Sequence, residues 1–268
     1  MPSLRLVQID AFSETAFGGN PAAVMPLDTW LPDETLQAIA EENNLSETAY
    51  YRPAENDAGA DYELRWFTPT AEVAMCGHAT LATGHLLLNE NPDRDTVRFR
   101  TRKAGILEVR RSGDGYELDL PVTPMEPAER ADLLVALGIP KGEVFLSVAD
   151  TAEDTAIILL PDADAVRNTA PDFKALTDIH LMAIVTAQGD ETDVVSRVFV
   201  PAWGIDEDPV TGSAHAALTP FWAERLGRDS FSAFQASARG GHVGCRLDGD
   251  RAVLSGRCAT VIEGEFFL

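Results

Sequence analysis

Short runs of hydrophobic residues, several of them alternating with polar ones, mark the first half of the chain and end at Gly, Pro, Asp or Asn. They predict strands over residues 4–12, 61–67, 96–101, 105–111 and 116–120. A helical period opens at Pro32 and ends at Asn44, which predicts a first helix, and residues 77–88 predict a second. The first half is therefore expected to be rich in strands.

The pattern starts again after Pro121. One helix is predicted to end at Gly138, and another is predicted over residues 212–226. The strands predicted between them cover residues 144–148, 155–160, 180–186 and 194–200. This order resembles that of the first half and suggests an internal duplication.

Two pairs of motifs support the duplication. Residues 65–69 and 197–201 both read R-x-F-x-P at the end of a predicted strand, 132 positions apart. The turns Cys76-Gly77-His78 and Thr211-Gly212-Ser213 both follow an acidic residue and lead into an alanine-rich helix, with their glycines 135 positions apart. Two matches at nearly the same offset make duplication a better explanation than chance.

The boundary between the halves is expected near residues 120–127, where three prolines fall between a strand and a helix. We therefore place the N-terminal half over residues 1–121 and the C-terminal half over residues 122–256. The C-terminal strand around residues 257–268 is expected to return to the first half.

Composition and charge limit the classes of partner. The chain has 43 Asp and Glu residues against 21 Lys and Arg residues, a formal charge of −22 that would repel nucleic acid and anionic lipid. The N-terminus has no signal-peptide pattern, and no apolar run is long enough for a membrane span, so we expect a cytoplasmic protein. Three cysteines without C-x-x-C spacing predict neither a disulfide framework nor a cysteine zinc site.

The two repeated turns are candidate anion sites. Gly77 and Gly212 allow close backbone approach, and the small residues after them leave the first N–H groups of a helix unpaired. Two such helix ends facing each other would hold a carboxylate. The alternative is that both glycines only allow a strand and a helix to pack closely.

Two acidic residues are candidates for proton transfer. Glu47 lies where a loop passes into a strand, and a carboxyl group buried at such a place could act as acid and base in turn. The alternative is a solvated acid in a helix-exit turn. Asp208 precedes Gly212 by four residues and could either take part in catalysis or cap the following helix.

His78 and Cys76 lie at the start of a predicted helix, whose dipole lowers the pKa of an imidazole or a thiol there. We expect His78 to be neutral and to form hydrogen bonds. His85 lies two turns further along, but no third ligand follows at metal-site spacing, so no metal is predicted. The sequence contains no motif for dinucleotide binding, for nucleoside triphosphate binding or for a serine hydrolase.

Five ordered motifs resemble the PhzF-like family of phenazine-biosynthesis proteins: FGGNPAAV from Phe17, NLSET from Asn44, FTPTAEV from Phe67, CGHATLA from Cys76 and DPVTGSAH from Asp208. With Gly240-Gly241 near the end, the resemblance spans essentially the whole chain. It implies an α/β (α+β) fold like that of diaminopimelate epimerase, in which two pseudo-symmetric halves each wrap a mixed sheet around a central helix and face each other across a cleft.

The resemblance also implies the roles of the site residues. Glu47 would move a proton on the substrate with His78 and Asp208 beside it, and the substrate would be held by Gly77, Gly212 and Ser213. No cofactor would be needed. Epimerases of this fold use two cysteines, one from each half, whereas this chain keeps Cys76 alone, so the resemblance does not extend to two-thiol epimerisation.

The leading hypothesis is therefore an isomerase that transfers a proton on a small carboxylate-bearing metabolite at a site between the halves, and that forms a homodimer. One alternative is an amino-acid racemase or epimerase with Cys76 or Asp208 as the second base. Another is a module on the same fold that binds a small molecule or a protein without catalysis. The sequence does not identify the substrate.

Overall fold

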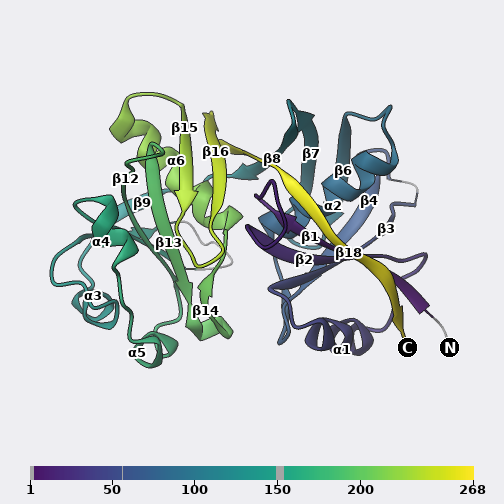
Figure 1. Ribbon diagram of the computed structural model, residues 1–268, viewed down its shortest axis with the longest axis horizontal. Helices are drawn as coiled ribbons and strands as arrows, with labels where there is room; N and C mark the ends of the chain where they lie inside the picture. The colour runs from purple at the N-terminus through teal and green to yellow at the C-terminus, as the bar shows by residue number, and fades with distance from the viewer. Residues whose placement is uncertain (1–2, 56, 149–153) are drawn as a thin grey trace. The chain divides into compact units, whose positions relative to one another are not determined.

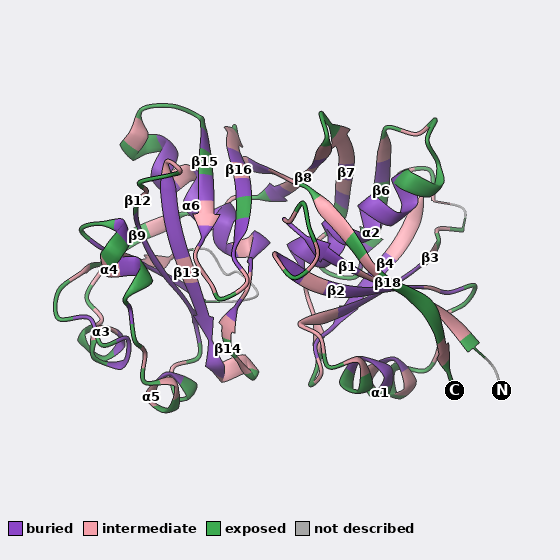
Figure 2. Ribbon diagram, in the orientation of Figure 1, coloured by how far each residue is buried: buried purple, intermediate pink, exposed green. Residues whose placement is uncertain are grey.

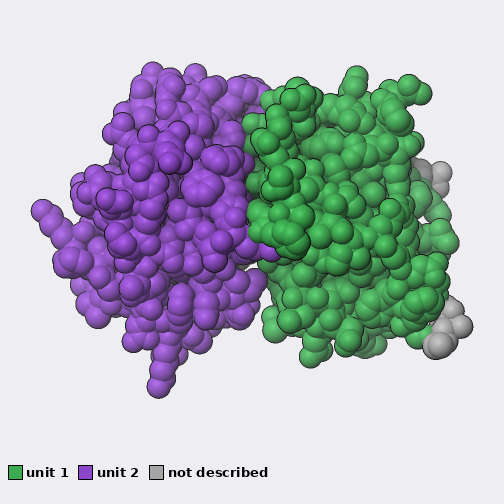
Figure 3. Space-filling view, viewed as in Figure 1, with its two compact units in different colours: residues 1–120, 255–268 green, residues 121–254 purple. Residues whose placement is uncertain are grey.

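The structure is a computed structural model, and it describes residues 3–55, 57–148 and 154–268. The chain divides into two compact units (Figure 3). Unit 1 is Met1–Leu120 with Ser255–Leu268, and unit 2 is Pro121–Leu254. The strand β17 (Arg251–Gly256) carries the chain from unit 2 back to unit 1.

Unit 1 contains two helices, α1 (Asp33–Asn43) and α2 (Gly77–Glu90). Its strands are β1 (Ser3–Ala11), β2 (Asn20–Pro26), β3 (Glu47–Pro53), β4 (Tyr62–Phe67), β5 (Glu72–Val73), β6 (Thr96–Thr101), β7 (Ile106–Ser112), β8 (Gly115–Pro121) and β18 (Cys258–Phe267). They pair in the order β18-β1-β2-β3-β4-β6-β7-β8, parallel at β2–β3 and β4–β6 and antiparallel elsewhere, with β5 beside the end of β4.

The helices of unit 1 cover different faces of this sheet (Figure 1). Helix α1 places Leu36 and Ile39 against Tyr50 and Phe67 of β3 and β4. Helix α2 contacts β1, β2, β3, β6, β7 and β18, and its residues from Gly77 to Leu88 are buried (Figure 2). Because strands from both ends of the sheet contact the same helix, the sheet wraps around α2.

Unit 2 repeats the arrangement. Its helices are α3 (Ala131–Ala136), α4 (Ala163–Arg167), α5 (Phe173–Thr177) and α6 (Gly212–Leu226), with a 3₁₀ turn η1 (Pro201–Trp203). Its strands are β9 (Met125–Ala128), β10 (Glu143–Ser147), β11 (Thr155–Leu159), β12 (Met182–Gln188), β13 (Val194–Val200), β14 (Ile205–Asp208), β15 (Ser230–Gln235) and β16 (Gly241–Asp248).

The strands of unit 2 pair in the order β9-β10-β11-β12-β13-β15-β16, parallel at β11–β12 and β13–β15, with β14 beside the end of β13. Alternate residues of β12 face opposite sides. Ala183 and Val185 join the core under α3, α4 and α5, whereas the hydroxyl of Thr186 accepts a hydrogen bond from Trp222 of α6 at 3.1 Å. Each half is thus a mixed sheet with a central helix, which confirms the predicted fold class.

The duplication extends to side chains. Arg65 of β4 makes a bidentate ion pair with Glu72 of β5, with Nε–Oε1 and Nη2–Oε2 distances of 2.8 and 2.9 Å. Arg197 of β13 pairs in the same way with Glu207 of β14, at 2.7 and 2.9 Å. Each guanidinium also lies about 5 Å from the ring of the phenylalanine two residues later. The R-x-F-x-P repeat therefore encodes the same contact twice.

In the part of the chain that the structure describes, no helix has the length and apolar character that a membrane crossing requires.

Candidate active site

Glu47 is the first residue of β3 and pairs with Ala22 of the parallel strand β2. Because side chains alternate along a strand, Glu47 faces α2 while Tyr50 faces α1. Its side chain is 14% exposed. The carboxylate is therefore largely shielded from solvent, in contrast to the solvated acid that the sequence left as an alternative.

His78 lies in the first turn of α2, whose N-cap residue is Cys76. Its side chain is 4% exposed, and its Nε2 atom lies 3.0 Å from Oε2 of Glu47. Glu47 begins β3, whereas His78 lies in α2, which follows β4 and β5 in the chain. The packing of α2 on the sheet brings the two side chains together. The N-terminus of a helix also favours a carboxylate nearby.

Asn20, the first residue of β2, contacts the other side of the imidazole. Its Nδ2 atom lies 3.2 Å from Nδ1 of His78, and the residue is fully buried. With the amide donating to Nδ1, the imidazole proton lies on Nε2 and faces Glu47. Sequence reasoning missed this residue, although the signal was present as the asparagine of the FGGNPAAV motif.

The loop before Asn20 has an unusual backbone. Phe12 and Phe17 have φ angles of +59° and +75°, and Gly19 has +62°. A Cβ atom at Gly19 would collide with the carbonyl oxygen of Ala11, so only glycine fits there. The buried carboxylate of Asp10 accepts a hydrogen bond from the Phe17 N–H at 2.9 Å and holds the loop. Such strain persists where surrounding contacts fix it, often beside functional sites.

Cys76 completes the group. Its Sγ atom lies 3.5 Å from Nδ1 and 4.0 Å from Nε2 of His78. Ligand-type atoms of Glu47, Cys76 and His78 all lie within 4.8 Å of one another, so these three residues could hold a metal ion. The predicted absence of a metal stays a prediction.

The corresponding turn in unit 2 contains Asp208, at the end of β14. Its Oδ2 atom accepts a hydrogen bond from the hydroxyl of Thr211, which is the N-cap residue of α6. Gln235 then ties the turn to β15, because its Oε1 accepts from the Thr211 N–H at 2.9 Å and its Nε2 donates to the Asp208 carbonyl at 2.7 Å. Asp208 is therefore buried in a polar network at the helix start.

The offset of 135 assigns counterparts in unit 2 to the residues of unit 1. Met182 corresponds to Glu47, since each begins the second strand of a parallel pair. Ser213 corresponds to His78, and Thr211 to Cys76. Unit 1 brings Glu47, His78 and Gly77 together, whereas Asp208, Gly212 and Ser213 belong to unit 2. That the two sets share a cleft stays a prediction.

Two other histidines are structural. His85 lies 3.1 Å from Tyr116 Oη and from Thr260 Oγ1, and burial lowers its pKa to about 4. His215 contacts the Thr211 carbonyl through Nδ1 at 2.8 Å, and burial lowers its pKa to about 4 as well. Both are therefore neutral at physiological pH and separate from the Glu47 group.

The arrangement in unit 1 can exchange a proton. A carboxylate and an imidazole at 3.0 Å, both shielded from solvent, are groups that can accept a proton from a carbon acid and return it.

Comparison with known proteins shows which family the chain belongs to. The family model of phenazine biosynthesis-like proteins matches residues 9–264. An uncharacterized isomerase of Pseudomonas aeruginosa is 47% identical over 268 residues, which cover 99% of both chains. Another from Halalkalibacterium halodurans is 40% identical and covers 97% of both. The crystal structure of a PhzF-family phenazine biosynthesis protein from Enterococcus faecalis superposes with a TM-score of 0.88 at 40% identity over all of both chains. The chain therefore belongs to the phenazine biosynthesis-like (PhzF) family.

Proposed function

We propose that the protein is an isomerase that moves a proton between carbon atoms of a small carboxylate-bearing metabolite. Glu47 takes the proton and returns it, and the His78 ring, whose Nε2 atom lies 3.0 Å from Oε2, stabilises the carboxylate while Glu47 is charged. Asn20 keeps the imidazole in the tautomer that faces Glu47. The step is redox-neutral and needs no cofactor, because one proton leaves one carbon, one proton is added at another, and no electrons are gained or lost.

The observation that carries this proposal is the 3.0 Å contact between Glu47 Oε2 and His78 Nε2 in a largely buried setting. A carboxylate fully open to water would make a poor proton shuttle and would favour a binding module without catalysis. The names of the close relatives support isomerisation as the reaction class. The substrate itself is proposed only as a class, a small acid whose charge suits the N-terminal turn of α2.

The experiment is hydrogen exchange in D₂O. A panel of small cyclic and acyclic carboxylates is incubated with the protein, and deuterium at carbon is followed by NMR. Glu47→Gln, which keeps the shape of the side chain, is expected to abolish incorporation while the circular dichroism spectrum stays native. Incorporation should persist after dialysis against a chelator. Full activity of folded Glu47→Gln would end the proposal.

A second candidate is a racemase or epimerase, favoured by the Cys76 thiol 3.5 Å from the His78 ring. Its product would differ from the substrate only in configuration, so chiral separation of the deuterated product distinguishes it from an isomerase that shifts the position of a bond. The homodimer expected from the family is also a proposal, and sedimentation velocity tests it.

A further inference from the structure

The strand β4 changes partners halfway along its outer edge. Leu64 pairs with Thr101 of β6, whereas Trp66 pairs with Val73 of β5, and Arg65 lies at the point where the two partners separate. We call this point a fork, and unit 2 contains the same arrangement. There Ser196 pairs with Gln235 of β15, Val198 pairs with Asp208 of β14, and Arg197 lies between them.

The two forks differ in the residue that ends the parallel strand. In unit 2, Gln235 spans the fork by hydrogen bonding to Asp208 and Thr211 on the far side. In unit 1 the corresponding residue is Thr101, whose short side chain donates instead to the carbonyl of Gly105 in its own turn, at 2.9 Å. The fork of unit 1 is therefore not bridged by this residue.

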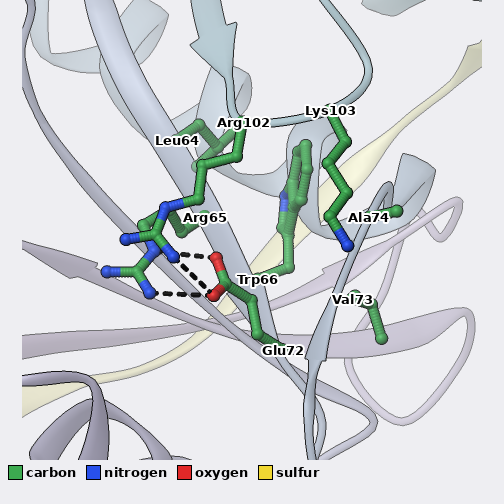
Figure 4. Close-up of a pocket in the computed structure, with 8 residues that line it drawn as sticks. All are labelled: Leu64, Arg65, Trp66, Glu72, Val73, Ala74, Arg102 and Lys103. Carbon is green, nitrogen blue, oxygen red and sulfur yellow. Dashed lines mark hydrogen bonds and ion pairs between the residues drawn. The ribbon is translucent and has the colours of Figure 1, made fainter.

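A pocket of about 220 Å³ opens at the fork of unit 1 (Figure 4), several times the ~30 Å³ that one water molecule occupies in the liquid. Its walls are residues 64–66 of β4, residues 72–74, and Arg102 and Lys103 from the turn after β6. Ala74 lies two positions before Cys76, so the pocket borders the segment that leads into the Glu47–His78 group.

The lining has a surplus of positive charge in a protein whose net charge is −22. Arg65 is neutralised by its bidentate pair with Glu72. It also donates to Asp33 Oδ1 at 2.8 Å, and Asp33 Oδ2 lies 3.7 Å from Arg102, so Lys103 carries the positive charge that these carboxylates leave over. Arg102 donates from Nη1 to the same carboxylate at 2.9 Å, and its other N–H groups remain as donors. Among the described residues Lys103 forms no ion pair, and Figure 4 shows its ammonium group unconnected to the side chains around it.

Trp66 lines the same pocket with a side chain whose N–H is itself shielded from solvent. Trp66 is almost fully buried, and its indole N–H has no hydrogen-bond acceptor within the described ranges of the chain. An unpaired buried N–H is costly, so this one requires an explanation. Arg102 and Lys103 thus supply two charged donors beside this N–H, and the carboxylates nearby, Glu72 and Asp33, are both already paired with arginine.

We propose that this pocket is a binding site for a small oxyanion, a phosphate or a carboxylate group of a metabolite, held by Lys103 and Arg102 beside Trp66. The site is separate from Glu47 and does not depend on the proposed reaction. Its ligand contacts Val73 and Ala74, so occupancy would act on the segment that leads to Cys76 and His78.

The test is calorimetric titration of the full chain with inorganic phosphate and, separately, with malonate, against chloride at equal ionic strength because salt screens exposed charges. The wild type should bind at least one of the two saturably, and the two titrations show which anion chemistry the pocket prefers. Lys103→Gln should weaken that binding roughly tenfold or more, the change expected when a charge-assisted hydrogen bond is lost.

Lys174→Gln is the matched control. It removes the same charge from an exposed position on α5 and should leave binding unchanged. Arg102→Gln provides a second variant at the pocket and should also weaken binding. Absence of saturable binding of both anions, or equal binding by wild type and Lys103→Gln, would overturn the proposal. Lys103 is exposed, so its variant is expected to fold normally.

Discussion

In unit 2 the hydroxyl of Ser213 contacts the thioether sulfur of Met182 at 3.9 Å, at the two positions that His78 and Glu47 occupy in unit 1. The duplicated frame thus presents a titratable pair in one unit and a weakly polar pair in the other. The methionine thioether cannot take a proton from a substrate carbon or return one, so this pair has no acid/base capacity. At this pair of positions, therefore, only unit 1 has the groups for acid/base chemistry.

The first prediction concerns the unit 2 residues assigned to the same reaction. Asp208→Asn is expected to lower kcat by about 10²-fold or more if it transfers a proton. Ser213→Ala should raise KM about 3- to 10-fold with little change in kcat, the effect of one lost hydrogen bond to substrate. Steady-state kinetics on a substrate identified by deuterium exchange measures both.

Ser230→Ala serves as the control, because Ser230 is an exposed serine of the same unit. Unchanged kinetics in both Asp208→Asn and Ser213→Ala would remove unit 2 from the reaction.

Cys76→Ala is predicted to keep deuterium exchange within about tenfold of wild type. The carboxylate and imidazole of Glu47 and His78 remain in place, and the counterpart of Cys76 in unit 2 is Thr211, which offers no second thiol. Loss of about 10³-fold or more, with native circular dichroism, would instead support the thiol as a base and the racemase as the function.

Stability is predicted to fall as the pH is lowered from about 6.5 to about 4. Burial lowers the pKa of His85 and of His215 from 6.5 to about 4, so in this range the unfolded chain binds protons that the folded protein does not. By linkage the free energy of unfolding then rises with pH, and the stability is lost as the pH falls. The expected size is about 1 to 3 kcal/mol for each histidine.

Urea unfolding followed by circular dichroism across this pH range measures the effect. His215→Gln should reduce the pH dependence, since it removes one of the two buried imidazoles. An identical slope in the variant would show that His215 does not cause it. The hydrogen bond from Arg100 lowers the pKa of Asp57 to about 2. Asp57 therefore changes stability below pH 4 and does not contribute to the effect measured here.

Gly84→Ala is predicted to destabilise the protein by about 1 to 3 kcal/mol, although alanine favours helix more than glycine does. Gly84 lies in α2 where the helix approaches β7, and a Cβ atom there would come within 2.6 Å of the Val109 Cβ atom. Thermal unfolding measures the loss. Adding Val109→Ala should restore part of it by opening space, whereas a double variant no better than Gly84→Ala would contradict the steric explanation.

Several elements could be predicted from local pattern. The ranges expected for β6, β13 and α6 match the structure, because turn residues bound each of them and their apolar period is clear. The strands β2, β5, β9 and β14 to β17 and the short helices α4 and α5 were not predicted. In β2, the sequence NPAAVMP has neither alternation nor flanking polar residues, because the strand is buried on both faces between β1 and β3.

The candidate site likewise contains residues that the sequence indicated and contacts that it did not. Glu47 was a candidate from its place before a strand, but its local sequence favoured a solvated turn, and only the family resemblance supported a role in proton transfer. Asn20 lies in a quoted motif, yet nothing local indicates that its amide meets an imidazole from α2. The pocket at Lys103 depends on how β5 and β6 diverge from β4, which no single segment encodes.

The sequence by itself determined the duplication, the family, the mixed α/β fold and the start of each central helix, because these depend on residue types and spacings that recur along the chain. Only the tertiary structure decided that Glu47 meets His78 at 3.0 Å, that Met182 takes its place in unit 2, and that a pocket forms at the β4 fork beside Lys103. Contacts of this kind depend on strand register and on the packing of helices against sheets. These are set by many non-local interactions together rather than by the residues that make the contact.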